Sequence, residues 1–76
     1  MPDVREVDAT GLSCPMPVIE LAKAVETIDP GEQVRLLATD PAARVDVPVW
    51  CRMKRHRLAE ASEDDGVYRF VVRRSH

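Results

Sequence analysis

The sequence predicts a two-layer α/β (α+β) sandwich, in which two helices pack on one face of a four-stranded mixed sheet in the order β-α-β-α-β-β. Three observations lead to this fold class: one strongly amphipathic helical stretch, alternating apolar residues in two later stretches, and a glycine-containing turn between the last two stretches. With 76 residues, the chain is expected to form a single domain over residues 1–76.

The first strand and the first helix are expected in the opening part of the chain. Residues 4–9 are predicted to form a strand that ends at Thr10-Gly11. The segment Asp29-Pro30-Gly31 should stop the helix, because proline lacks an amide donor and glycine permits a sharp turn. The helix itself is predicted from one apolar stripe at spacings i, i+3, i+4, i+7 and i+10: Val18, Leu21, Ala22, Val25 and Ile28.

The middle of the chain is expected to hold a second strand, residues 33–39, and a second helix that runs to about residue 55. Because Pro48 interrupts the helical pattern, we place Asp46 near the N-cap, so that Pro48 lies in the first turn where its missing N–H costs nothing. Asp40 is likewise interpreted as a cap. The strand should bury Val34, Leu36 and Ala38. The helix should direct Val49, Trp50 and Met53 toward the core.

Two strands, residues 57–63 and 67–73, are expected to close the chain as a hairpin around Asp64-Asp65-Gly66. The last strand should present three side chains on one face: Tyr68, Phe70 and Val72.

The composition is that of a folded chain, with 45% hydrophobic and 32% charged residues, which excludes a disordered tail. Eleven basic and thirteen acidic residues give a formal net charge of −2, whereas nucleic-acid binders are usually basic. No apolar run approaches the roughly 20 residues of a membrane-spanning helix. Residues 1–6 are polar, so no signal peptide is expected and a cytoplasmic location is predicted.

The segment Gly11-Leu12-Ser13-Cys14-Pro15-Met16-Pro17 lies where the first strand gives way to the first helix. Pro15 and Pro17 are harmless in a first turn, whose N–H groups have no intrahelical partner, and should stiffen it. Cys14 then falls at or next to the N-cap, where the helix dipole would lower its pKa and favour a thiolate or a perthiolate. Such a thiol could accept and hand over a sulfur atom. The alternative is a small buried cysteine at a helix entrance.

The order of short motifs along the chain is also informative. Asp8 and Gly11-Leu12 precede the CPxP sequence Cys14-Pro15-Met16-Pro17. Further motif residues follow at Lys23, Pro30-Gly31-Glu32, Ala38-Thr39-Asp40-Pro41, Asp46-Val47-Pro48, Trp50-Cys51, His56, Leu58, Tyr68 and Phe70. In these features, which cover nearly the whole chain, the sequence resembles the TusA/SirA family of small sulfur-carrier proteins. One departure is Arg55, where many relatives have glycine before the histidine.

The resemblance implies the same β-α-β-α-β-β fold and a function in sulfur relay. Cys14 would carry the sulfur as a persulfide, with Pro15, Pro17 and Gly11 as its structural supports. A cysteine desulfurase or a rhodanese-type donor would supply the sulfur, and an acceptor protein would take it for tRNA thiolation, molybdenum-cofactor supply or sulfur oxidation. The chain would then be a sulfurtransferase-type carrier, monomeric alone and without a cofactor, rather than a stand-alone multiple-turnover enzyme.

Cys51, the second cysteine, is expected to be a core residue of the second helix. The alternative is a secondary thiol that pairs with Cys14, which requires Cα atoms within roughly 7 Å of each other. A zinc site formed by Cys14, Cys51, His56 and His76 would fit no common ligand spacing, so no metal site is expected.

A competing hypothesis uses the basic run at residues 52–57. It would make the protein a non-catalytic regulatory or RNA-binding module. The acidic net charge and the 4% aromatic content argue against this hypothesis, so stable nucleic-acid binding is not expected. Two other interpretations of the run are a solvated surface and a docking surface for an oppositely charged protein.

Overall fold

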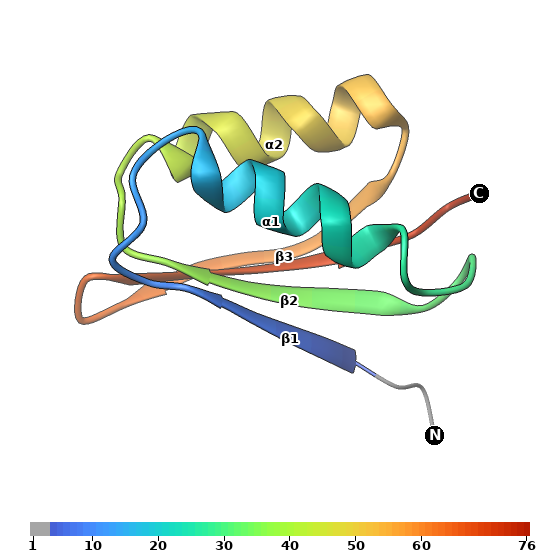
Figure 1. The fold of residues 1–76 in the computed structure, drawn as a ribbon, viewed down its shortest axis with the longest axis horizontal. Helices are drawn as coiled ribbons and strands as arrows, with labels where there is room; N and C mark the ends of the chain where they lie inside the picture. The colour runs from blue at the N-terminus through green and yellow to red at the C-terminus, as the bar shows by residue number, and fades with distance from the viewer. Residues whose placement is uncertain (1–3) are drawn as a thin grey trace.

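The structure, a computed structural model, describes residues 4–76, so the first three residues of the polar opening stretch lie outside it. The chain forms six elements: β1 (Val4–Ala9), α1 (Met16–Val25), β2 (Gln33–Ala38), α2 (Ala43–Lys54), β3 (Arg57–Asp64) and β4 (Val67–Arg73). Both helices cover the same face of the sheet (Figure 1). The predicted fold class and element order are therefore confirmed.

The sheet has the order β1-β2-β4-β3, in which β1 and β2 are parallel and the other neighbours are antiparallel. Ala9, the last residue of β1, pairs with Ala38, the last residue of β2. Because the two strands run in the same direction, the chain leaves both of them at the same edge of the sheet. The loops that lead into α1 and α2 therefore lie side by side (Figure 1).

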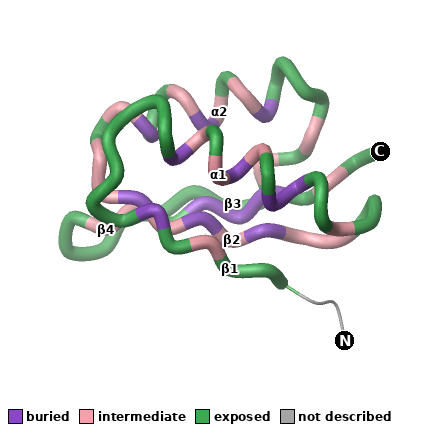
Figure 2. The backbone as a smooth tube through the Cα atoms, viewed as in Figure 1, coloured by how far each residue is buried: buried purple, intermediate pink, exposed green. Residues whose placement is uncertain are grey.

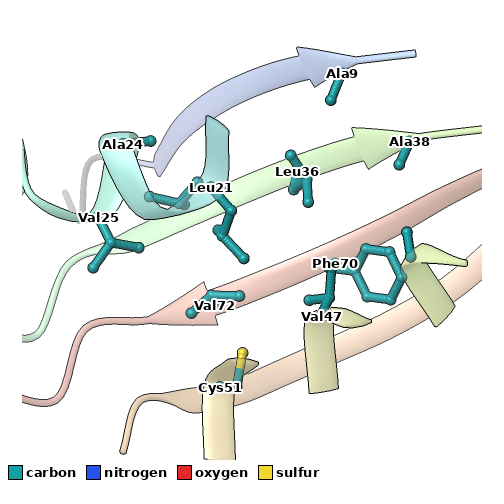
Figure 3. Packing of buried hydrophobic residues seen from close by; sticks show 12 residues of the cluster. Ala9, Leu21, Ala24, Val25, Leu36, Ala38, Val47, Cys51, Phe70 and Val72 are labelled. Atoms are coloured by element: carbon teal, nitrogen blue, oxygen red, sulfur yellow. The ribbon is translucent and has the colours of Figure 1, made fainter. Parts of the chain in front are cut away.

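The hydrophobic core lies between the sheet and the two helices, and the buried positions occur on both the helices and the strands (Figure 2). The predicted inward faces of β2 and β4 are confirmed, although Tyr68 is only partly buried. The buried cluster, shown in Figure 3, consists of Ala9, Leu21, Ala24, Val25, Val34, Leu36, Ala38, Ala43, Val47, Cys51, Phe70 and Val72.

Helix α2 begins earlier than the sequence predicts. It starts at Ala43 with Ala42 at the N-cap, so Asp46 lies inside the first turn and Pro48 in the helix interior. The carboxylate of Asp40 accepts the backbone N–H of Ala42 at 3.0 Å and so supports the earlier start. Asp40 therefore acts as expected, whereas the interpretation of Asp46 as a cap is wrong.

The earlier start also changes which face of α2 is buried. Val47 and Cys51 enter the core, Trp50 is half-buried against it, and the prediction for two other residues is wrong: Val49 is 43% exposed and Met53 is 70% exposed. Residues 45–50 carry apolar side chains around much of the helix, so the pattern alone does not select the inward face. Packing against the sheet makes that selection.

Helix α1 ends at Val25, before the predicted stop at residues 29–31. Beyond it, the N–H groups of Thr27 and Ile28 bond to carbonyls three residues earlier, at 3.0 and 3.4 Å. Such shorter-range bonds tighten a helix end. Ile28 still packs against the core, as the apolar stripe predicts.

The last two strands form the predicted hairpin. Asp64 pairs with Val67, which leaves Asp65 and Gly66 as the turn. Their φ angles of 53° and 81° are those of a type I′ turn, which requires positive φ at both positions and so favours an Asp-Gly pair.

Candidate functional site

Cys14 lies in the loop between β1 and α1, immediately before the N-cap residue Pro15. The residue is exposed, so the alternative of a buried cysteine at a helix entrance is excluded. The peptide bond that joins Cys14 to Pro15 is cis. Pro17, in contrast, is buried in the first turn of α1 and anchors this end of the helix on the protein interior.

Local hydrogen bonds shape the start of this loop. The carboxylate of Asp8 accepts the backbone N–H of Thr10 at 3.0 Å and its hydroxyl at 2.6 Å. These bonds favour the charged carboxylate and lower the pKa of Asp8. Gly11 follows with φ of 80°, a conformation that residues with a side chain rarely adopt. The chain thus turns sharply as it leaves β1.

The neighbouring loop, between β2 and α2, holds the Cys14 loop in place. The backbone N–H of Gly11 donates to the hydroxyl oxygen of Thr39 at 2.8 Å. The backbone N–H of Cys14 donates to Asp40 at 2.7 Å. The two loops meet because they leave the same edge of the sheet, and Thr39 and Asp40 follow directly after β2.

The side chain of Cys14 has a second acidic neighbour. Its thiol donates a hydrogen bond to the Asp46 Oδ2 atom at 2.8 Å. This bond is the largest cause of a raised pKa for Cys14, followed by partial desolvation and by the negative charges of Asp46 and Asp40. The predicted lowering of this pKa by the helix dipole is therefore wrong.

The physical reason is that the N-terminus of α1 offers the sulfur few free N–H donors. Pro15 and Pro17 have no N–H group, and the N–H of Met16 donates to the carbonyl of Ser13 at 2.9 Å. The carboxylates brought in by the second loop and by α2 therefore dominate the electrostatics at Cys14. The sequence carried a signal for this arrangement, since a parallel β1–β2 pair brings the starts of both helices together.

A groove opens beside Cys14 between α1 and α2. Its volume is about 310 Å³, and it is lined by Cys14, Pro15, Val18, Asp46, Val49, Trp50 and Met53. Two of the lining residues, Val49 and Met53 of α2, are exposed apolar side chains. Exposed apolar residues gathered in this way are typical of a surface that binds another protein.

Cys51 has the opposite environment to Cys14. It is 3% exposed and belongs to the core cluster (Figure 3). Burial raises the pKa of this thiol to about 11. Cys14 and Cys51 are both free thiols, and the groove beside Cys14 does not include Cys51. The prediction of a core residue is confirmed.

The basic run at residues 52–57 extends from the last turn of α2 to the first residue of β3. Arg55 adopts a left-handed conformation there, with φ of 59° and ψ of 39°. The ring of His56 lies against Trp50, with 5.6 Å between ring centroids, and stacks on His76 at 4.8 Å. Part of the run thus serves to join α2 to the end of the chain.

The zinc-site alternative finds no support in this arrangement. Over residues 4–76, the structure contains no group of three or more His, Cys, Asp or Glu side chains that could hold a metal ion. In the same residues, no helix is long and apolar enough to cross a membrane.

Comparison with known proteins places these features in context. The family model described as sulfurtransferase TusA matches residues 5–74. A sulfur carrier protein TusA from Pseudomonas paraeruginosa is 41% identical over 68 residues, which cover 90% of this chain and 86% of that protein. A sulfur carrier protein TusA from Pseudomonas fluorescens is 37% identical over 75 residues, or 99% of this chain and 90% of that protein.

Among solved structures, a SirA-like protein from Desulfitobacterium hafniense has the same fold. The TM-score is 0.83 at 24% sequence identity, and the match covers 97% of this chain and all of the other.

Proposed function

Because this chain belongs to the TusA family of sulfur carrier proteins, we propose that Cys14 is the residue on which it carries sulfur, as a persulfide. The observation that carries this proposal is the contrast between its two thiols. Cys14 is exposed beside an open groove, whereas Cys51 is buried in the core. A thiol that exchanges sulfur must be open to the approach of another molecule, and only Cys14 meets that condition.

The transfer needs no oxidant. The Cys14 sulfur attacks the outer sulfur of a donor persulfide, and a new sulfur–sulfur bond forms as the old one breaks. The electron pair of the old bond stays with the donor's own cysteine sulfur, which takes up the proton that Cys14 has lost. Onward transfer repeats the step with an acceptor thiolate attacking the outer sulfur on Cys14.

The surroundings of Cys14 support a relay between proteins rather than a reaction on a small molecule. The groove is open, and its lining includes Val49 and Met53, which are exposed and apolar. Such a surface suits the docking of a sulfur-donor protein and then of a sulfur-acceptor protein. Donors of the cysteine desulfurase or rhodanese type fit this role. A carrier thiol that must stay reduced between transfers suits the cytoplasm.

The Gly11 and Pro17 positions support the same proposal. Gly11 allows the turn that presents Cys14, and buried Pro17 fixes the start of α1 to the interior. Neither residue has a group that could take part in sulfur transfer, so both act as structural supports. No observation on residues 4–76 supports the alternative of RNA binding through the basic run.

The proposal is tested by loading the protein with a cysteine desulfurase and cysteine, followed by intact-mass measurement. The wild-type protein should gain one sulfur atom, and reduction with dithiothreitol should remove it. Cys14→Ser should gain none. The matched control is Cys51→Ala, which removes the other thiol and should load like the wild type. Loading that survives Cys14→Ser and is lost in Cys51→Ala would refute the assignment.

A further inference from the structure

We propose that Asp46 is a positioning residue for this transfer: it holds Cys14 as a neutral thiol in the free carrier, until a docked donor protein places a cation against the carboxylate. The inference rests on the proposed role of Cys14 and adds that Asp46 regulates when this residue reacts. It also names the chemistry of the donor surface, which must present a lysine or an arginine beside its persulfide.

The geometry at the sulfur supports this role. The Cys14 thiol lies 2.8 Å from Asp46 Oδ2, within hydrogen-bond distance. Of the two acidic neighbours, Asp40 already accepts two backbone N–H groups, those of Cys14 and Ala42. Asp46 is therefore the carboxylate that binds the thiol itself. It belongs to α2, whereas Cys14 precedes α1.

The charged groups that act on the Cys14 sulfur are all negative. The titratable groups that act on the thiol are Asp46 on α2 and Asp40 in the loop before α2, and both are acidic. The ion pairs of residues 4–76 are Lys23–Glu20 and Arg35–Glu6, so Asp46 has no basic partner within the described chain. A carboxylate that accepts a hydrogen bond from a thiol and lines an open groove favours the neutral thiol over the thiolate.

A cation supplied by a partner would reverse this preference. Pairing with a lysine or an arginine would weaken the hold of Asp46 on the thiol proton and would offset the negative charge beside the forming thiolate. The Cys14 proton leaves to solvent, the sulfur attacks the donor's outer sulfur, and the donor's cysteine sulfur is protonated in turn. Because a perthiolate is also an anion, Asp46 would repel the loaded sulfur once the partner leaves, which favours its onward transfer.

The first test measures the pH dependence of Cys14 alkylation by iodoacetamide, resolved from Cys51 by mass spectrometry. Asp46→Asn should lower the midpoint by about one pH unit, a size typical of the loss of an adjacent charge. At pH 7 the thiolate fraction then rises about tenfold, but a less basic thiolate is less nucleophilic, so alkylation should accelerate about threefold. Asp46→Glu, which keeps the charge, should restore the high midpoint. Glu26→Gln makes the same charge change at the far end of α1 and should leave the midpoint unaltered.

The second test uses glutathione persulfide, a sulfur donor without a basic surface. Asp46→Asn should take up sulfur from it several-fold faster at pH 7 than the wild type does. An alkylation midpoint that does not move in Asp46→Asn would overturn the inference, as would equal uptake rates.

A measurement on the wild type covers the case in which Asp46→Asn does not fold. The Cys14 midpoint should be higher in the native protein than in urea, and an equal or lower native midpoint would also overturn the inference. Failure of desulfurase loading on Cys14 would instead contradict the proposed function. The two failures are thus distinguishable.

Discussion

The backbone N–H of Cys14 donates a 2.7 Å hydrogen bond to the carboxylate of Asp40, a residue 26 positions later in the chain. The same carboxylate accepts the N–H of Ala42 at the start of α2. One side chain thus joins the loop that carries the sulfur to the helix that carries Asp46. The contact is long-range in sequence, and it exists because β1 and β2 are parallel neighbours.

We expect Asp40→Ala to lower the melting temperature and to loosen the Cys14 loop, since two backbone donors lose their acceptor. These bonds lower the pKa of Asp40 in the folded protein. The stability that they provide is therefore present above the unfolded pKa of the carboxyl and is lost as the pH falls through the folded pKa. Thermal melts between pH 2 and 7 measure both effects, with the pH range chosen around the usual value of about 3.9.

The control for this prediction is Asp64→Ala, which removes an exposed carboxylate at the end of β3. It should change the melting temperature far less than Asp40→Ala does. An Asp40→Ala protein that melts at the wild-type temperature across the whole pH range would show that these bonds do not stabilise the loop.

Arg74, near the C-terminus of the chain, caps the end of α1. Its guanidinium donates to the carbonyl oxygens of Val25 at 3.1 Å and of Ile28. A cation that bonds the last carbonyls of a helix also interacts favourably with the helix dipole. We expect Arg74→Gln to reduce the free energy of unfolding by about 1–2 kcal/mol, as measured by urea denaturation.

The neighbouring residue supplies the control, because Arg73 is exposed at the end of β4. Arg73→Gln removes the same charge one residue earlier, and we expect a change within about 0.5 kcal/mol. Equal losses in the two variants would mean that charge, rather than the bonds to α1, accounts for the effect.

Arg55 occupies a left-handed position at the end of α2, with φ of 59°. The N–H of His56 bonds to the carbonyl of Cys51 at 2.9 Å, as in helix endings that favour glycine at this position. Arg55→Gly should therefore raise the free energy of unfolding by about 0.5–1 kcal/mol, because glycine adopts this conformation without steric cost. Urea denaturation measures the gain.

Arg55→Ala separates conformation from charge. Alanine removes the guanidinium but keeps the Cβ atom that disfavours positive φ. It should bring none of the gain, and a similar gain from alanine would trace the effect to lost charge repulsion within the basic run.

His56 couples stability to pH near neutrality. Burial, followed by the nearby His76 and the charge of Arg74, lowers the pKa of His56 in the folded protein. Its Nδ1 atom accepts the N–H of Ser75 at 3.1 Å, which requires the ring to be unprotonated at that atom. The unfolded state therefore binds more protons at mildly acidic pH, and stability should decline as the pH falls below about 6.5.

Urea midpoints measured from pH 5 to 8 test this expectation. His56→Gln should flatten the dependence in this range, although it also removes the stacking on Trp50 and His76 and so lowers stability at every pH. A wild-type midpoint that stays constant or rises between pH 7 and 5 would contradict the assignment of the pH response to His56.

Several features of the fold follow from local pattern. The alternation in β2 and β4, the apolar stripe of α1 and the Asp-Gly turn were each predictable, since one buried face or one turn geometry decides them. The position of Cys14 next to the N-cap was predictable for the same reason, because two prolines so close together fit only the first turn of a helix.

Where α2 begins was not predictable in this way. Its apolar residues occur on more than one face, and the choice between Val47 and Val49 as the inward residue depends on the angle at which the helix packs against the sheet. Pro48 strengthened the wrong prediction, because its preference for a first turn outweighed the signal from Asp40, whose carboxylate accepts the N–H of Ala42 at the start of α2.

The sequence by itself determined the order of the elements and the signature around Cys14, whereas the exposure of Cys14 was established only by the structure. Only the tertiary structure decided what surrounds that sulfur. Asp40 and Asp46 reach it from another loop and another helix, brought there by the parallel pairing of β1 and β2. Because an electrostatic environment depends on distances through space, the sign of the pKa change at Cys14 could not be obtained from neighbours along the chain.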